Sequence, residues 1–322
     1  MKVSIFFYPL IITPIIFSFI SFFSSKFNIF KTKEKVSFLG GLGIILSFFL
    51  SFFIFVFIEN ISLDKDFKIL LLFSFLIFLI EFFDDLKEFD LKKKFILHIF
   101  FCLIFLIFAK RIQIYFFPSF LNFILSFLWI IGIMNAFNLL DIKDGLCSGV
   151  SLIVNLFFLF ICILLKDYLL SFFFFSLFVS LSIFYIFNLP PAKMFMGNSG
   201  SHFLGFLFAG ISMYIDYANL ENVFAIFVPV LLLGLPILDT LFLILVRIKK
   251  RIFPFKKTQD HLFLRLFRKT NNYYFSLFLI YFLTSLWASS SIFLFLKKFL
   301  WFFIFFGLSF LCSLKVILLA LT

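Results

Sequence analysis

The sequence predicts an all-α, polytopic integral membrane protein with about ten or eleven transmembrane helices. Of its 322 residues, 64% are hydrophobic, and the mean hydropathy is +1.21. Apolar runs recur at roughly the ~20 residues that a helix needs to cross the hydrocarbon core of a bilayer. Helices are expected because the bilayer offers the backbone no hydrogen-bond partner outside the spanning segment. No polar stretch is long enough for a soluble domain, so we expect one transmembrane domain over residues 1–322.

Charged and turn residues divide the chain into eleven expected spans. In order they are 3–23, 38–58, 67–83, 95–109, 112–134, 150–165, 168–188, 203–217, 223–246, 273–296 and 299–321. The fourth, sixth and eighth are short, and any one of them could be re-entrant. The first run is too long for the core of a signal peptide and has no small-residue cleavage pattern, so we retain it as a span.

Cysteine and histidine spacing gives no sign of a disulfide framework or a zinc site. The four cysteines are dispersed and form no CxxC pair, and the three histidines lie far apart in the sequence. We expect His98 and His202 to pack or to cap a helix locally.

Basic residues predict the orientation. If the N-terminus is outside, the loops after the odd-numbered spans hold nineteen Lys and Arg residues, whereas the outside segments hold eight. The positive-inside rule then makes those loops cytoplasmic. Every unusual polar cluster falls in one of these loops or at a helix end that faces them, so segments distant in sequence are predicted to converge on one membrane face.

Four polar residues recur every three positions where the fifth apolar run ends: Asn135, Asn138, Asp141 and Asp144. Carboxylate and carboxamide oxygens suit Mg²⁺, which usually binds one or two protein carboxylates together with substrate phosphates. A solvated helix cap is the alternative, but Asn135 lies deeper in the apolar run. Asp144-Gly145 also occurs in enzymes that transfer phosphoalcohols from cytidine diphosphate, but the residues that follow do not continue that motif, and we reject it.

Two carboxylates, Asp84 and Asp85, stand side by side where the third span leaves the membrane. Adjacent like charges raise the pKa of one group or recruit a cation, so the pair suits a base beside a metal. A solvated loop of mixed charge is the alternative. After the seventh span, Gly197 to Ser201 forms a hydroxyl-rich turn whose backbone N–H groups could cradle a phosphate, or else a turn with an ordinary Ser cap.

Further charges fall in and after the ninth run. Asp239 lies inside this run, where a carboxylate is functional or ion-paired by default, and Pro236 should kink the helix. A hydrogen-bonded structural carboxylate near the helix end is the alternative. The basic loop that follows suits an anchor to anionic lipid. Within it, His261 and Arg265 are four residues apart and could face the site together.

In this order the motifs resemble the polyprenyl-phosphate N-acetylhexosamine-1-phosphate transferases, glycosyltransferase family 4. The resemblance spans roughly residues 35–266 and covers Leu39-Gly-Gly41, Asp84-Asp85 with Lys92 and Lys94, Asn135 to Leu146, Pro191 to Ser201, Pro236 to Thr240, and Pro254 to His261. The forms at 135–138 and 236–240 look closer to the undecaprenyl-phosphate N-acetylglucosamine-1-phosphate transferase branch than to phospho-N-acetylmuramoyl-pentapeptide transferase.

The resemblance implies a reaction and its partners. An N-acetylhexosamine 1-phosphate would pass from a UDP-sugar to undecaprenyl phosphate, releasing UMP, as the initiating step of a cell-surface polysaccharide. The implied cofactor is Mg²⁺, with Mn²⁺ as an alternative. The implied location is the bacterial inner membrane, with the site on the cytoplasmic face. Membrane lipid is an expected partner, nucleic acid is not, and a homodimer is a family-level expectation.

The resemblance also implies roles for individual residues. The implied catalytic residues are Asp84 or Asp85, which would activate the lipid phosphate, together with Asp141 and Asp144, the latter for nucleotide or sugar positioning. Implied metal ligands are Asn138, Asp141 and Asn198. Implied substrate-binding residues are Lys92 and Lys94 for the lipid phosphate, with Asn135, Lys193, Ser199, His261 and Arg265.

Three departures from the family pattern leave the substrate open. Asn198 stands where the family has a Mg²⁺-binding aspartate, the first glycine of Asp-Gly-x-Asp-Gly is lost, and His261 is one of three expected imidazoles. A catalytically inactive homologue is therefore one alternative. A secondary transporter or lipid flippase is another, but it should show internal repeats and ionisable residues near the midplane. Asp239 is the one buried carboxylate found, and no repeat is apparent.

Overall fold

The computed structural model describes residues 7–27, 30, 36–87, 89–251 and 259–321. Over these ranges the secondary structure is helical, without a β-strand, which confirms the all-α class. The chain forms two compact units, Met1–Ile215 and Asp216–Thr322. The single domain expected from the sequence stays a prediction.

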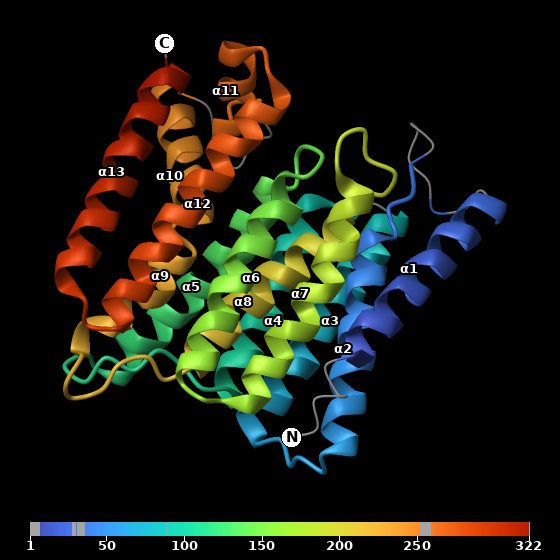
Figure 1. Ribbon diagram of the computed structural model, residues 1–322, viewed down its shortest axis with the longest axis horizontal. Coiled ribbons are helices and arrows are strands. Elements are labelled where there is room, and N and C mark those ends of the chain that lie inside the picture. Colours follow the sequence, from blue (N-terminus) through green and yellow to red (C-terminus); the bar gives the residue numbers. More distant parts are fainter. Residues whose placement is uncertain (1–6, 28–29, 31–35, 88, 252–258, 322) are drawn as a thin grey trace. The chain divides into compact units, whose positions relative to one another are not determined.

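The first unit consists, over its described residues, of eight helices that follow the apolar runs in order (Figure 1). They are α1 Phe7–Phe27, α2 Gly40–Ile58, α3 Lys65–Lys87, α4 Leu91–Phe108, α5 Ser119–Leu140, α6 Leu146–Leu164, α7 Tyr168–Asn188 and α8 Gly197–Tyr214. Several boundaries differ from expectation. Helix α5 begins seven residues after 112 and continues six residues past 134, α4 and α6 each begin four residues early, and α8 begins six residues before 203. The extension of α5 contains Asn135 and Asn138, and that of α8 contains Asn198, Ser199 and Ser201, so polar residues lie inside these helices beyond the apolar runs.

Helix α8 forms the centre of the first unit. Fifteen of its 18 residues are buried, and it packs against α2, α3 and α5. Close approach to α2 depends on glycine, because a Cβ on Gly41 would lie 2.5 Å from the backbone nitrogen of Gly200. Phenylalanine rings fill much of the remaining space; Phe173, for example, packs edge-on against Phe48 and Phe52.

Seven helices are long and apolar enough to cross a membrane, or eight if the bent pair of the second unit forms one span. This confirms a multi-pass membrane protein. Helices α3, α4 and α8 have 23, 18 and 18 residues but fall outside the seven. The first two carry several charges, and the first turn of α8 is polar. The count is lower than the eleven expected because these three helices carry the polar residues of the site described below.

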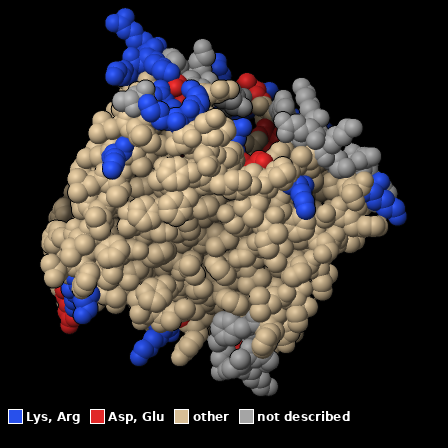
Figure 2. Space-filling model, turned by 45° about the horizontal axis from the view of Figure 1, so that its top comes forward, with Lys and Arg blue, Asp and Glu red and all other residues tan. Residues whose placement is uncertain are grey.

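One end of the first unit, the site end, gathers the polar clusters of that unit, whereas Asp260 and His261 belong to the second unit. Phe195 accepts the N–H of Gly40 at 3.0 Å, and Asp144 accepts that of Ala192 at 3.0 Å. The ends of α5 and α7 therefore meet the start of α2. Figure 2 shows that most of the drawn surface is uncharged, with Lys, Arg, Asp and Glu mainly near its edges.

The second unit contains a bent pair, a short helix and a helical hairpin. Its elements are the 3-10 helix η2 Val223–Phe227, α9 Val228–Leu232, α10 Gly234–Lys249, α11 Leu262–Thr270, α12 Tyr273–Phe295 and α13 Phe299–Leu321. Segments Val223–Leu232 and Gly234–Lys249 meet at 66°. The predicted kink thus exists, but the break comes at Leu233. Pro236 lies in the first turn of α10, where a missing N–H breaks no intrahelical bond.

Candidate functional site

The last turns of α3 and the first turns of α4 place opposite charges together. Glu81 and Asp84 are three residues apart on α3, and Lys94 and His98 are four apart on α4, so each pair shares a helix face. Asp84 accepts a hydrogen bond from the Lys94 ammonium at 2.8 Å and from the Phe89 N–H at 2.7 Å. The Asp84 carboxylate is therefore paired.

The neighbouring carboxylate, Asp85, faces α8 instead. It accepts the backbone N–H groups of Asn198 and Ser199, each at 3.0 Å. These belong to the first turn of a helix, where N–H groups lack intrahelical acceptors and the dipole favours an anion. The turn from Gly197 was expected to offer such groups to a phosphate. In this structure the chain's own carboxylate takes two of them.

Asn198 also links α8 to Asp84. Its side-chain amide donates to Asp84 Oδ2 at 3.2 Å, so Asp84 receives donors from α4, from the loop before it and from α8. A carboxylate at position 198 would bring two like charges to this distance. The amide makes the contact neutral and favourable.

Helix α5 and the turn after it supply the second polar group. Asn138 accepts a hydrogen bond from Ser201 of α8 at 3.3 Å, and Ser201 also contacts the Asn198 carbonyl at 3.3 Å. Asp141 caps α5 and precedes Asp144 by three residues. The structure thus brings the predicted metal ligands from α5 and α8 to one end of the unit.

Asp141 occupies an environment that favours a bound cation. Burial, together with the charges of Asp85 and Asp144, raises the pKa of Asp141 to about 7. A dication among these oxygens would remove the mutual repulsion, and carboxylate oxygens are hard ligands. The residues present therefore fit Mg²⁺ or Mn²⁺.

Sequence reasoning missed a buried cluster behind Asp84. Glu81 Oε1 lies 2.5 Å from His98 Nε2, and Glu81 Oε2 lies 3.0 Å from His202 Nδ1 and 2.6 Å from Lys94 Nζ. The local role expected for His98 was wrong, since its partner is on another helix. The available signal was helical spacing: Glu81 is one turn before Asp84, and His98 is one turn after Lys94. The ligand atoms of Glu81, His98 and His202 lie within 4.8 Å of one another, so these three could hold a metal ion.

A second missed residue is Asn188 at the end of α7. Its carbonyl accepts the N–H of Gly145 at 3.0 Å and the hydroxyl of Ser148 at 2.7 Å, and its amide donates to the Met194 carbonyl at 3.0 Å. One side chain thus joins the start of α6, the end of α7 and the segment before α8. Gly145 has a positive φ of 75°, which suits glycine at this turn.

The remaining predicted site residues of the first unit are either exposed to solvent or hydrogen-bonded within the protein. Lys92 and Lys193 are exposed. Ser199 is buried, and Asn135 donates to the carbonyl of Ile131 in its own helix at 2.7 Å. Asn135 therefore satisfies its amide within α5. The substrate-binding roles of these residues stay predictions.

His261 and Arg265 belong to the second unit. Asp239 of α10 accepts the N–H of Leu262 at 3.0 Å and lies 3.5 Å from His261 Nδ1, so it caps α11, as in the structural alternative. Arg265 and Lys250 pair with Asp260 at 2.8 and 2.7 Å. Although burial opposes ionisation, these two cations lower the pKa of Asp260. The family-like segment Pro254 to Lys257 lies outside the described residues.

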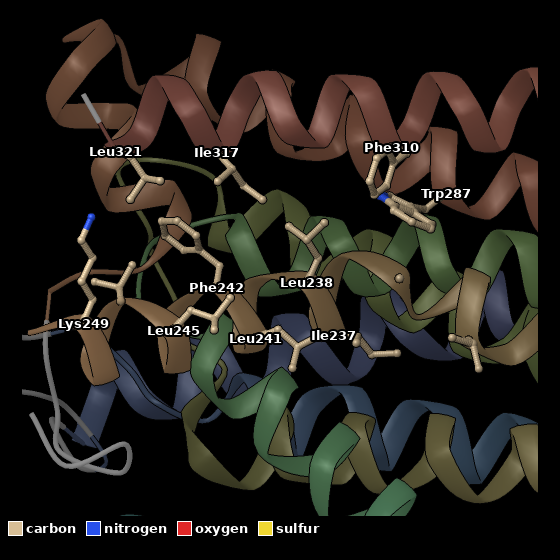
Figure 3. A pocket seen from close by; sticks show the side chains of 13 residues that line it. Ile237, Leu238, Leu241, Phe242, Leu245, Lys249, Trp287, Phe310, Ile317 and Leu321 are labelled. Carbon is tan, nitrogen blue, oxygen red and sulfur yellow. The ribbon is translucent and has the colours of Figure 1, made fainter. Parts of the chain in front are cut away.

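An apolar groove of about 400 Å³ runs within the second unit (Figure 3). Side chains of α10, including Leu238 and Phe242, face Phe310 and Ile317 of α13 across it. Lys249 is the charged residue among those lining it. Such a lining suits a hydrocarbon chain.

Comparisons with known proteins match the part of the chain that contains this candidate site. Residues 67–216 match the model of glycosyl transferase family 4, and the match ends where the first unit ends. The chain is 41% identical over 128 residues to the "Probable undecaprenyl-phosphate N-acetylglucosaminyl 1-phosphate transferase" of Bacillus subtilis, covering 38% of this chain and 34% of that protein.

Two further relatives are similar over other lengths. An undecaprenyl-phosphate alpha-N-acetylglucosaminyl 1-phosphate transferase of Thermotoga maritima is 28% identical over 64% of this chain and 63% of its own. A phospho-N-acetylmuramoyl-pentapeptide-transferase of Carboxydothermus hydrogenoformans is 45% identical over 26% of each. Each alignment spans less than two thirds of the relative. The matched region contains Asp84, Asp141 and Asn198, and over residues 67–216 the chain is similar to glycosyl transferase family 4.

Proposed function

We propose that this protein transfers an N-acetylhexosamine 1-phosphate from a UDP-sugar to undecaprenyl phosphate and releases UMP. The observation that carries the proposal is the convergence of Asp85 from α3 with Asp141 and Asp144 from the turn after α5, at one end of the first unit, where burial and the charges of Asp85 and Asp144 raise the pKa of Asp141 to about 7. Such a group calls for a cation, and a dication is what two phosphate-bearing substrates need in order to approach each other. The names and alignments of the relatives support the same reaction.

In the proposed reaction, an oxygen of undecaprenyl phosphate attacks the sugar-bearing phosphorus of the UDP-sugar. The new P–O bond forms as the bond to the UMP oxygen breaks, so UMP leaves with the electron pair. Asn138 and Asp141 would hold Mg²⁺ or Mn²⁺, which when bound supplies positive charge to the pyrophosphate. Asn198 would contribute by fixing Asp84 through its amide, rather than as a charged ligand.

Basic residues at the start of α4 would receive the lipid phosphate. Lys92 is exposed, whereas Lys94 is held by Asp84 and Glu81. An ammonium group has three N–H donors, so the two carboxylates leave Lys94 one for a phosphate oxygen. The site would face the cytoplasm from the bacterial inner membrane, and the reaction would initiate a cell-surface polysaccharide.

A turnover assay tests the proposal. Purified protein in detergent would be given undecaprenyl phosphate, Mg²⁺ or Mn²⁺ and a panel of UDP-N-acetylhexosamines, with UMP and the lipid product both measured. We expect metal-dependent UMP release matched by a lipid-linked pyrophosphoryl sugar, and the preferred sugar identifies the substrate. Asp141→Asn should abolish turnover in protein that still folds. Substrate movement across liposomes without a new lipid product would instead show a transporter.

A further inference from the structure

Two helices direct basic side chains at one carboxylate of α3, Glu81. Lys94 and His98 come from α4 and His202 from α8, at 2.6, 2.5 and 3.0 Å from its oxygens. Glu81 is 0% exposed and His202 is 1% exposed. A charged group buried this deeply needs partners, because transfer of an unpaired charge out of water is costly.

Charge balance decides what kind of cluster this is. Glu81 and Asp84 together carry two negative charges and Lys94 carries one positive charge. A single proton shared within the cluster neutralises the remainder, whereas a dication would leave the cluster positive. The contact of His98 with Glu81 is a hydrogen bond, and those of His202 and Lys94 with Glu81 are of ion-pair length. The cluster is therefore better described as a network of ion pairs and hydrogen bonds than as a metal centre.

The network closes into a ring that contains Lys94. On one side, Lys94 contacts Asp84 at 2.8 Å and Glu81 at 2.6 Å. On the other side, His202 contacts Glu81 and the carbonyl of Asn198, each at 3.0 Å. The Asn198 amide donates to Asp84 at 3.2 Å and completes the ring. A lysine in the first turns of a helix is disfavoured by the helix dipole, and its long side chain is otherwise mobile. Two carboxylates on α3 offset both effects.

We propose that Glu81, held by His98 and His202, is a positioning residue that fixes the Lys94 ammonium against Asp84 and leaves one of its N–H groups for a substrate phosphate. This inference rests on the proposed function for the phosphate. The placing of Lys94 itself does not depend on it. Glu81 does not touch substrate in this proposal and acts through Lys94.

The test removes the network while keeping the fold. Replacing one member of a buried ion pair leaves the other charge unpaired, whereas replacing all members with apolar residues is often tolerated. The variant is therefore E81L/H98L/H202L, with E81Q as the conservative change and S74A as the control. Ser74 is buried on the same helix and donates only to the Leu70 carbonyl, 2.7 Å away.

The first measurement does not need activity. Acetylation of Lys94 by a water-soluble amine reagent is followed by mass spectrometry, with the exposed Lys93 as the internal reference. Freed from Glu81, Lys94 should react about tenfold faster relative to Lys93 in the triple variant, since hydrogen bonds to charged groups are among the stronger ones. S74A should match the wild type. Unchanged Lys94 reactivity in a folded triple variant would overturn the proposal.

The second measurement is turnover. We expect kcat to fall about tenfold or more in the triple variant and in E81Q, because a displaced Lys94 ammonium no longer stabilises charge in the transition state. The thermal stability of the triple variant should stay near that of the wild type. Full kcat in the folded triple variant would reduce Glu81 to a structural role. A stoichiometric metal in the wild type that the triple variant lacks would also overturn the proposal. If the wild type itself releases no UMP, the proposed function fails, and the acetylation result still decides the network.

Discussion

Two adjacent acidic residues have different partners in this protein. Asp84 pairs with Lys94 of α4, and Asp85 accepts two N–H groups of α8. Neighbours in a helix point about 100° apart, so side chains at i and i+1 reach different helices. The two adjacent carboxylates therefore have separate roles: Asp84 forms an ion pair with Lys94, and Asp85 caps the N-terminus of α8.

Asn198→Asp should couple the stability of this site to Mg²⁺. The change places a second carboxylate where an amide now donates to Asp84 at 3.2 Å, so like charges meet and a dication relieves the repulsion. We expect lower thermal stability than wild type without divalent ions and a larger gain on adding Mg²⁺, measured by thermal unfolding in detergent. Asn135→Asp, on α5 where the amide donates to the Ile131 carbonyl, serves as the charge-matched control. An equal Mg²⁺ response in all three proteins would contradict the Asn198–Asp84 contact.

The raised pKa of Asp141 predicts a pH dependence of stability. Its pKa is about 7 in the folded protein, against a usual value of 3.8, so between about pH 4 and 7 the folded state binds a proton that the unfolded state has released. The stability of the folded protein without metal should therefore fall as pH rises through this window. Comparison of unfolding in wild type and Asp141→Asn isolates this contribution, because asparagine does not titrate.

The same pKa predicts the pH dependence of metal binding. A proton and a cation compete for Asp141, so stabilisation by Mg²⁺ should grow as pH rises to about 7 and then level off. A flat Mg²⁺ response across this range would show that Asp141 is not a ligand.

At the scale of elements, α8 explains why the site lies where it does. Its first turn carries Asn198, Ser199 and Ser201, and the helix then passes through the centre of the unit, buried on nearly all sides. Because α8 packs against α2, α3 and α5, the side chains that these four helices bring to the site have little freedom to move. Such rigidity is what a phosphoryl-transfer site needs, because positioning supplies much of the catalysis.

Glycine substitutions test this packing. Gly41→Ala should destabilise the protein by roughly 1–3 kcal/mol, the usual cost of overpacking, because the added Cβ would lie 2.5 Å from the Gly200 backbone nitrogen. Gly132→Ala is the matched control: it lies within α5, and its Cβ would meet nothing within 4 Å. There alanine should be neutral or stabilising by up to about 1 kcal/mol. Thermal unfolding of both variants gives the comparison, and equal behaviour would argue against the α2–α8 contact.

At the scale of the whole molecule, the chain alternates between two ends of its first unit. Asp144 and Ala192 meet at the site end, whereas Lys110 donates to the Tyr214 carbonyl at 3.0 Å at the other. The distribution of basic residues predicts that the site end faces the cytoplasm.

Cysteine labelling tests this orientation. Lys193 at the site end and Lys166 between α6 and α7 are both exposed, and they should lie on opposite sides of the membrane. In a background without the four native cysteines, Lys193→Cys should react with an impermeant maleimide only in inverted vesicles, and Lys166→Cys only in intact cells. The reverse pattern would invert the topology, and labelling of both from one side would contradict the span assignment.

The sequence by itself determined the helical membrane class, the order of the apolar helices and the segments that form the site. Hydropathy and charge act locally, and a bilayer sorts them directly into spans and loops. Only the tertiary structure decided that His98 and His202, 104 residues apart, share Glu81, that Asn188 joins three segments, and that Asp84 and Asp85 separate. Those contacts depend on how helices rotate and pack against one another, and a rotation of one helix changes every partner without changing its apolar pattern.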